Sequence, residues 1–306
     1  MDCVSSSNRA DVRDFLVTRR ARITPQQAGL AFYGGNRRVP GLRREEVAML
    51  AGVSADYYTR LEKGNLTGVS DSVLEAIAGA LRLDEAERLH LLDLARAANT
   101  SPARATGRQV PQQLRPATKL ILDGMADTPA FVRNGRLDVL AVNTLGRALY
   151  APAFGTPGRA VNLARFRFFD PAARDFYPEF AESARTTVAL LRTEAGRDPF
   201  NASLTALIGE LCTRSEEFRT MWAAHDVRLH RSGRKHFRHP AVGPLDLMFE
   251  TMALEADEGL TLTAYTAEPG TPSHDGLKLL ASWAATSQHE NVTEVAESGA
   301  PQPSAP

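Results

Sequence analysis

The sequence predicts two domains, an all-α domain followed by an α+β domain that contains an antiparallel sheet. Three observations predict this order. Amphipathic helical patterns dominate residues 12–95, and a polar segment that contains proline and glycine follows at 99–112. Strand-like stretches on both sides of Asn134-Gly135 then open the second domain, and further strand-like stretches close it. We place the domains at 1–98 and 113–285, with a linker at 99–112 and a polar, disordered tail at 286–306.

Residues 42–64 predict a helix-turn-helix. Val47, Ala48 and Ala51 recur at helical spacing, and the small alanines allow two helices to cross closely. Gly52 suits the positive φ of a tight turn, and Ser54 is a good N-cap for the next helix. A helix-turn-helix places its second helix in the major groove of DNA. The motif therefore indicates a DNA-binding protein.

The second helix of this motif has a face for the core and a face for DNA. Tyr58 and Leu61 lie three residues apart and should face the core. We expect Arg60 to read a base edge, because a bidentate arginine–guanine contact gives about 1–3 kcal/mol of discrimination. The alternative for Arg60 is a solvated ion pair with Asp56. The predicted DNA-binding set, which includes phosphate contacts at the helix ends, is Arg43, Arg44, Ser54, Ala55, Asp56, Tyr57, Thr59, Arg60, Lys63 and Asn65.

Three more amphipathic helices, at 12–20, 70–81 and 84–95, bring the first domain to five helices. Residues 9–97 resemble the helix-turn-helix domain of the XRE (phage-repressor-like) superfamily. The runs Pro40-Gly41-Leu42-Arg43-Arg44-Glu45-Glu46-Val47-Ala48 and 54–62 resemble the actinobacterial branch whose second domain is the MmyB-like ligand-binding domain. That branch also has a long loop after the first helix, here 24–41. The resemblance implies that Glu62 pairs with Arg20 in a structural role.

The second domain begins with strands at 130–133 and 137–142, which the type I′ turn signal Asn134-Gly135 joins into a hairpin. Helices are predicted at 114–126, 143–150, 174–193, 204–213 and 273–283, and strands at 227–230, 235–239, 245–254 and 260–266. A hairpin, a helical middle and further antiparallel strands are the order of a PAS-like fold. Stretches such as 129–143, 222–227, 235–245 and 267–270 resemble the MmyB-like domain over roughly residues 110–285. That resemblance implies a fatty acid or a similar lipophilic ligand.

Aromatic and methionine side chains in this domain are candidates for a ligand cavity, although helical aromatics at such spacing also fit an ordinary core. The predicted ligand-binding set is Phe168, Phe176, Phe180, Trp222, His225 and Met248. Arg167, Arg228 and Arg231 are candidates for holding a carboxylate headgroup, or else solvated surface arginines. Four histidines, His225, His230, His236 and His239, lie close in sequence. We expect no metal there, because 236 and 239 face opposite sides of a strand.

Composition sets further limits. The 306-residue chain has a formal net charge of zero, and its first 69 residues carry eleven Lys and Arg against seven Asp and Glu. This small excess suggests that specific DNA binding needs a homodimer or a second contact surface. The two cysteines, Cys3 and Cys212, are far apart and fit a reducing cytoplasm. No signal peptide or membrane span is seen, so we expect a cytoplasmic, nucleoid-associated protein without a membrane partner.

No nucleophile elbow, P-loop, dinucleotide-binding glycine motif or HExxH is present. We therefore predict no enzyme, no catalytic residue, no cofactor and no metal. The sequence predicts instead a transcription regulator that binds double-stranded DNA and senses a lipophilic, fatty-acid-like small molecule. The alternative is a DNA-binding regulator whose second domain serves dimerisation or a protein partner without a ligand.

Overall fold

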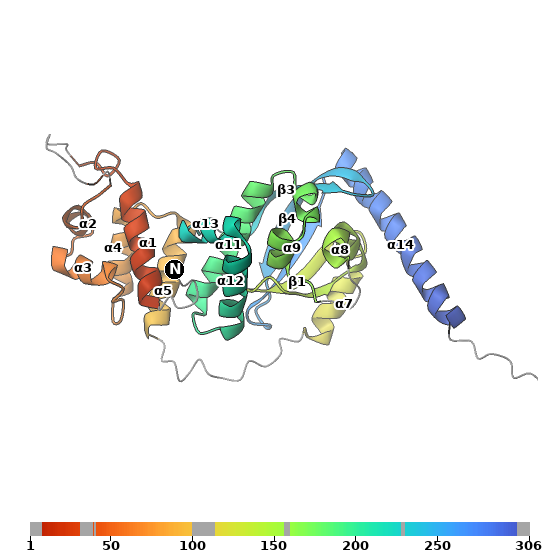
Figure 1. Ribbon diagram of the computed structural model, residues 1–306, viewed down its shortest axis with the longest axis horizontal. Helices are drawn as coiled ribbons and strands as arrows, with labels where there is room; N and C mark the ends of the chain where they lie inside the picture. Colours follow the sequence, from red (N-terminus) through yellow and green to blue (C-terminus); the bar gives the residue numbers. More distant parts are fainter. Residues whose placement is uncertain are drawn as a thin grey trace, which may run out of the picture. The chain divides into compact units, whose positions relative to one another are not determined.

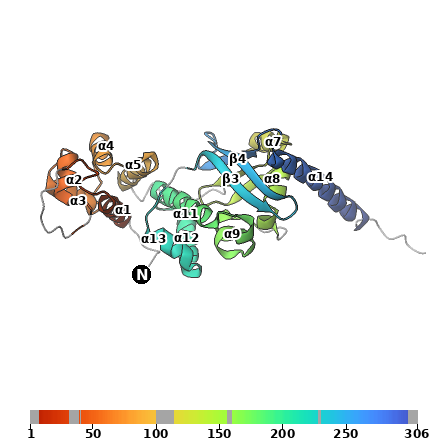
Figure 2. The same cartoon turned by 90° about the horizontal axis from the view of Figure 1, so that it is seen from above.

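The structure is a computed structural model that describes residues 8–30, 39, 41–99, 114–155, 160–227 and 230–298, with 287–298 described as backbone only. Packing divides the chain into two compact units (Figure 1, Figure 2). The first unit is Met1–Pro111 with Glu182–Leu229, and the second is Gln112–Ala181 with His230–Pro306. This division differs from the predicted domains at 182–229, because those residues pack with the N-terminal helices.

The N-terminal helices of the first unit match the five that the sequence predicts. They are α1 (Asn8–Arg22), α2 (Arg44–Leu50), α3 (Ala55–Glu62), α4 (Asp71–Ala80) and α5 (Glu85–Asn99). Phe15, Leu42, Val47, Tyr58 and Leu61 are each at most 1% exposed, and they share one core with α4 and α5. In the long loop between α1 and α2, residues 31–38 and 40 lie outside the described residues, so its predicted form is not compared.

The turn between α2 and α3 forms as its sequence predicts. Gly52 has a φ of +65°, the left-handed conformation in which glycine carries no steric cost. The backbone N–H of Val53 donates to the carbonyl of Ala48. The Ser54 hydroxyl oxygen then accepts from the backbone N–H of Tyr57 at 3.1 Å and caps α3.

Three further helices complete the first unit, and we call them the insert helices: α11 (Phe180–Arg197), α12 (Ala202–Arg214) and α13 (Glu216–Ala223). The single helix predicted at 174–193 is wrong. Helix α10 (Ala172–Phe176) ends just before Pro178, which disfavours helix at its preceding residue, and α11 begins after it. The strand predicted at 227–230 is absent at its described ends; Val227 instead is buried in the core of α1–α5.

The second unit is built on a five-stranded antiparallel sheet with the strand order β2-β1-β5-β4-β3. The strands are β1 (Ala130–Asn134), β2 (Val139–Val142), β3 (Ser232–His239), β4 (Gly243–Ala253) and β5 (Leu260–Thr266). Helix α7 (Pro116–Gly124) precedes the sheet. Helix α8 (Thr144–Leu149), the short 3-10 turn η1 (Ala151–Phe154), α9 (Leu163–Phe169) and α10 follow β2, and α14 (Pro272–Ser298) follows β5.

The β1–β2 hairpin is confirmed, but its predicted two-residue type I′ turn is wrong. Strand β1 runs through Asn134, and β2 starts only at Val139. The Asn134 side chain closes the longer loop, because its Oδ1 accepts from the backbone N–H of Asp138 and its Nδ2 donates to that carboxylate, both at 3.0 Å. Leu137, with a φ of +66°, takes the left-handed position instead of Gly135.

Alternation along the strands gives the sheet two covered faces. Phe131, Phe237 and Tyr265 point to one face, where α8, α10 and α14 cover an aromatic core. Ala130, Val132, Leu260 and Leu262 point to the other face, where Leu122 of α7 packs on them. Strand β1 is therefore buried along its whole length, as expected of a strand with both faces covered.

Helix α14 continues to Ser298, which corrects both its predicted end at residue 283 and part of the predicted disordered tail. The composition explains the difference: between Trp283 and Ser298 the chain has no proline or glycine, and these residues gather only from Gly299 onward. Residues 299–306 lie outside the described residues.

Candidate DNA-binding and ligand-binding sites

Helix α3 presents the predicted DNA-reading residues on one side and its core residues on the other. Tyr58 and Leu61 are buried, as predicted. The ten predicted DNA-binding residues are all exposed or half-buried, and Tyr57, Thr59 and Asn65 are the half-buried ones. Among the described residues, Arg60 and Asp56 form no ion pair with each other. Both side chains therefore remain available to a groove.

Glu62 is a buried carboxylate at the end of α3, and two arginines hold it. Arg20 donates from Nε at 2.6 Å and from Nη2 at 3.2 Å, which confirms the predicted structural pair. Arg44 donates to the same carboxylate from Nε at 2.7 Å. Burial raises the pKa of Glu62, but these hydrogen bonds outweigh burial and hold that pKa below its ordinary value. Arg44 thus has a structural contact besides its predicted phosphate contact.

The predicted ligand-binding residues are divided between the two units. Phe168, Phe176, Phe180 and Met248 belong to the second unit, whereas Trp222 and His225 belong to the first. Phe176 is 1% exposed and packs edge-on against Phe166 and Tyr150 in the aromatic core. Met248 lies on the opposite, outer side of β4 and is 38% exposed.

The aromatic core of the second unit contains a buried cation. The Arg167 side chain, on α9, is 4% exposed, and its Nε and Nη1 have no hydrogen-bond partner. Its guanidinium carbon lies 3.3 Å from the centre of the Tyr177 ring and 6.0 Å from that of Phe180. Burial lowers the pKa of Arg167, and the nearby tyrosines oppose that effect only in part. An arginine with unpaired buried donors is the arrangement that an anion would complete.

Other basic side chains surround Arg167, and we call Arg133, Arg167 and Lys235 the cation cluster. Burial, then the charges of these three residues, lowers the pKa of the nearby His230 to about 3, so its ring is neutral. Arg133 and Lys235 lie on the inner face of the sheet, at the same alternation as Phe131 and Phe237. The Lys235 ammonium lies 5.3 Å from the Tyr177 ring centre. Burial, then the charges of Arg167 and Arg133, hold its pKa well below the ordinary value. Within the described part of the chain, neither Arg167 nor Lys235 forms an ion pair.

Three tyrosines border the cation cluster. The hydroxyls of Tyr150 and Tyr265 share a hydrogen bond of 2.6 Å, and both side chains are at most 2% exposed. Burial is the main cause that raises the pKa values of Tyr150, Tyr177 and Tyr265, so all three are neutral at neutral pH. They supply polar atoms beside the cations without neutralising them. Arg167 therefore keeps two unpartnered donor nitrogens inside an apolar domain.

The remaining sequence candidates lie elsewhere. Arg228 falls outside the described residues, and Arg231 is exposed. His236 pairs with Glu179 at 2.8 Å, while His239, on the other face of β3, contacts the Ala148 carbonyl at 3.0 Å. His230 stacks on Phe249 at 4.3 Å. The four histidines thus make separate contacts, and no group of three or more metal ligands occurs among the described residues.

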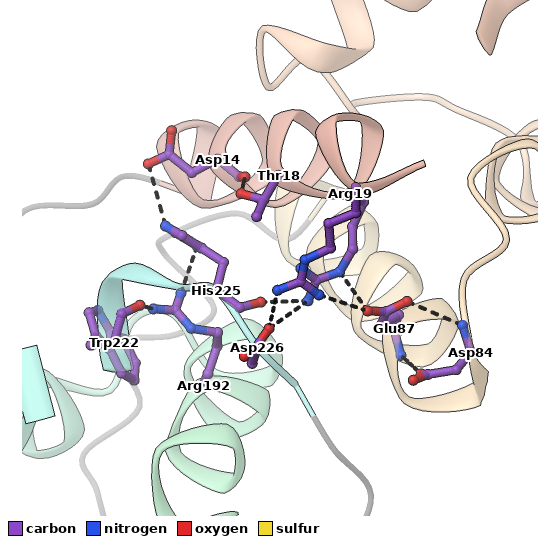
Figure 3. A network of polar contacts seen from close by, with 10 residues as sticks. Asp14, Thr18, Arg19, Asp84, Glu87, Arg192, Trp222, His225 and Asp226 are labelled. Carbon is purple, nitrogen blue, oxygen red and sulfur yellow. Dashed lines mark hydrogen bonds and ion pairs between the residues drawn. The ribbon is translucent and has the colours of Figure 1, made fainter. Parts of the chain in front are cut away.

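The first unit holds a polar network that the sequence analysis did not predict (Figure 3). It joins α1 and α5 to the insert helices, and we call this contact the insert interface. Arg19 of α1 is 2% exposed; its Nε pairs with Glu87 of α5 at 2.7 Å and its Nη2 donates to the His225 carbonyl at 2.6 Å. His225 has a φ of +53°, a turn that follows α13. Arg22 adds an ion pair with Asp226.

On the insert-helix side of the same interface, Arg192 contacts Trp222 and His225. Its guanidinium donates to the Trp222 carbonyl and approaches the His225 Nδ1 at 3.0 Å, while its carbon lies 3.9 Å from the Trp222 ring centre (Figure 3). Burial is the main cause that lowers the pKa of Arg192 to about 10 and that of His225 to about 4. At neutral pH Arg192 is therefore charged and His225 is neutral. Trp222 and His225 thus contact Arg192 at the insert interface, and their predicted role in ligand binding stays a prediction.

In the sequence, a glycine within α11 is the one feature that could have indicated this interface. Gly196 interrupts an otherwise good helical sequence, which often marks a close approach of another element. In the structure it lies against His90 of α5. The partner of a glycine cannot be read from one sequence, so the contact required the structure.

Comparison with known protein families gives two matches. Residues 17–91 match the model of a helix-turn-helix domain. Residues 114–280 match the model of the MmyB-like transcription regulator ligand binding domain. No curated protein matches the chain. The second match includes the insert helices, so the insert interface joins a segment of the matched ligand-binding family to the helix-turn-helix domain. No helix among the described residues is long and apolar enough to cross a membrane.

Proposed function

Because the chain belongs to the family of transcription regulators with an MmyB-like ligand-binding domain, we propose that it binds an operator through α3 and senses a lipophilic carboxylate, such as a fatty acid, in its second unit. The main evidence that the ligand has a carboxylate group is Arg167, a buried guanidinium with two unpartnered nitrogens. Binding of the ligand changes the affinity for DNA, because the ligand favours one of two states of the protein.

The cation cluster supports a carboxylate over a neutral lipid. An uncompensated buried charge destabilises a protein. A carboxylate that accepts hydrogen bonds from Arg167 would satisfy its two unpartnered donors and offset its charge. The surrounding phenylalanines, such as Phe166 and Phe176, offer an apolar environment for an alkyl chain. The order of hairpin, helices and three antiparallel strands supports a PAS-like fold for this unit.

The DNA-binding part of the proposal rests on the exposed face of α3. Arg60 and Asp56 are exposed and unpaired with each other, and the Ser54 cap fixes the start of the helix. We assign base reading to Arg60 and phosphate contacts to Arg43 and Lys63. A homodimer on two half-sites would double the modest positive charge of one helix-turn-helix domain.

One observation favours a second candidate function. Large apolar side chains are exposed on α7, β4 and α14, among them Leu120, Met252, Leu279 and Trp283. Such side chains are typical of protein contacts. In this alternative the second unit serves dimerisation or a protein partner, and no small molecule changes DNA binding.

The test uses the full-length protein with a DNA site selected from a random-sequence library. DNA affinity is measured by fluorescence anisotropy with saturated fatty acids of increasing length, and with the alcohols of the same lengths as controls. The proposal expects the acids, and not the alcohols, to change the affinity. Mass spectrometry of an organic extract from the purified protein identifies any retained lipid. If neither class of lipid binds or changes DNA affinity, the second candidate function is favoured.

A further inference from the structure

A cavity of about 120 Å³ lies at the insert interface. Asp11, His90 and Leu94 line it from α1 and α5, and Arg192 and Trp222 line it from the insert helices. A protein cavity of about 150 Å³ holds a molecule as large as benzene. The cavity therefore has room for a small organic molecule, and such a molecule would touch both sides of the interface.

The guanidinium of Arg192, which lines this cavity, has one nitrogen without a hydrogen-bond partner. Its Nη1 and Nη2 are engaged with His225 and the Trp222 carbonyl, which fixes the guanidinium in place. Its Nε is buried without a partner, although the side chain is only 3% exposed. A buried donor without an acceptor is unfavourable, and a charged donor is best satisfied by a carboxylate oxygen.

His90 also lines the cavity, with the Nδ1 edge of its ring packed against Gly196. Its ring is 3% exposed, and its Nδ1 has no hydrogen-bond partner. Burial, then the charges of Arg192 and Arg19, lower the pKa of His90 to about 3, so the ring is neutral at neutral pH. The His90 ring therefore adds no positive charge to the lining of the cavity, and Arg192 supplies its cationic donor.

Two carboxylates at the cavity make a purely anionic ligand unfavourable. Asp11 of α1 and Asp198, which follows α11, both line it. They would repel a ligand whose only charged group is a carboxylate, and they would attract an ammonium group. Leu94, Leu204 and Ile208 provide an apolar wall. The lining thus offers one cationic donor, two anionic groups and an apolar surface.

We propose that this cavity is a second effector site, which binds a small zwitterion of the amino-acid type with an apolar side chain. Its carboxylate contacts Arg192, and its ammonium group faces Asp11 and Asp198. Because the two sides of the interface both contact the ligand, binding stabilises the packing of the insert helices on α1 and α5. This site uses residues of the first unit and is separate from the cation cluster of the second.

The experiment measures binding to the full-length protein by calorimetry and by thermal shift. L-Alanine, L-valine and L-leucine are compared with two analogues of leucine, 4-methylpentanoate and 3-methylbutylamine, each of which lacks one charged group. At least one amino acid is expected to bind saturably at millimolar concentration, and each analogue should bind at least about tenfold more weakly. Hydrogen exchange should slow in α5 and α12 together when the amino acid is present.

Three variants make the result specific. Asp11→Asn, on a half-buried lining residue, should weaken amino-acid binding about tenfold, whereas the control Asp71→Asn, on an exposed residue of α4, should not. Arg167→Met should leave amino-acid binding intact, which separates this site from the fatty-acid site. Absence of saturable binding by all three amino acids would overturn the proposal, as would equal binding of 4-methylpentanoate or of the Asp11→Asn variant.

Discussion

The His90 ring lies so close to the α-carbon of Gly196 that no side chain fits between them. A β-carbon at position 196 would lie 2.6 Å from Cε1 and 2.7 Å from Nδ1 of His90. Phe15 packs edge-on against the same ring at 5.1 Å, which limits its movement. Gly196 therefore sets the closest approach of α11 to α5.

This contact predicts that Gly196→Ala loosens the insert interface. In a free helix the change would add about 0.5–1 kcal/mol of stability, but overpacking of the close contact between Gly196 and His90 costs about 1–3 kcal/mol. We expect a lower melting temperature, together with faster hydrogen exchange in α5 and α11. Gly79→Ala is the matched control, because a β-carbon on that exposed position of α4 meets nothing within 4 Å. A Gly196→Ala protein as stable as Gly79→Ala would contradict the prediction.

Glu62 gives a prediction about acid stability. Removing one partner of a buried ion pair costs about 3–5 kcal/mol, so Glu62→Gln should be strongly destabilised at pH 7. The folded pKa of Glu62 lies below its ordinary value of 4.5. Its contribution is therefore complete above pH 4.5 and is lost as the pH falls through the folded pKa. Urea unfolding at several pH values should show the two proteins converging below pH 4.5; a constant difference would disprove the linkage.

The first unit shows what a single sequence can and cannot predict. The turn at Gly52, the cap at Ser54 and the buried Tyr58 follow from local spacing, and the structure confirms them. The Arg20–Glu62 pair was implied by family resemblance and is also present. The insert interface could not be predicted from one sequence. Arg19 and Arg192 are far apart along the chain, and most arginine side chains in proteins are exposed to solvent.

The second unit shows the same limit for a ligand site. Arg167 was a candidate headgroup residue by its type alone, while its burial became visible only once β1 and β3 placed Arg133 and Lys235 on the same inner face. The sequence analysis assigns Trp222 and His225 to the same candidate cavity as the phenylalanines of the second domain. The chain instead carries α11–α13 into the first unit, and periodicity does not indicate where a helix packs.

Arg60 and Lys63 should differ in how they affect DNA binding. Both side chains are exposed on or just after α3. Arg60→Ala should cost about 1–3 kcal/mol on the preferred site and relax the base preference at one position. Lys63→Ala should weaken binding to all sequences alike and reduce the salt dependence. Binding-site selection followed by anisotropy at several salt concentrations separates these effects, and identical base preferences in the two variants would refute the assignment.

Replacing Arg167 with methionine should preserve or raise the stability of the protein and should weaken fatty-acid binding. Replacing a buried, unpaired charge with an apolar side chain of similar length is neutral or stabilising, by about 1 kcal/mol or more, although the contact with Tyr177 is lost. We therefore expect Arg167→Met without ligand to melt at or above the wild-type temperature. The same variant should lose the thermal shift that a fatty acid produces, because the carboxylate no longer finds its bidentate donor.

Arg174→Met provides the control for this change. Arg174 also lies over an aromatic ring, with its guanidinium carbon 4.3 Å from the centre of Phe180, but its side chain is exposed. It should keep the fatty-acid response, since an exposed arginine has water to satisfy its donors and holds no buried charge for a ligand to offset. A marked loss of stability in Arg167→Met would mean that its charge is already compensated inside the domain. Retention of the full fatty-acid response in that variant would place the headgroup elsewhere.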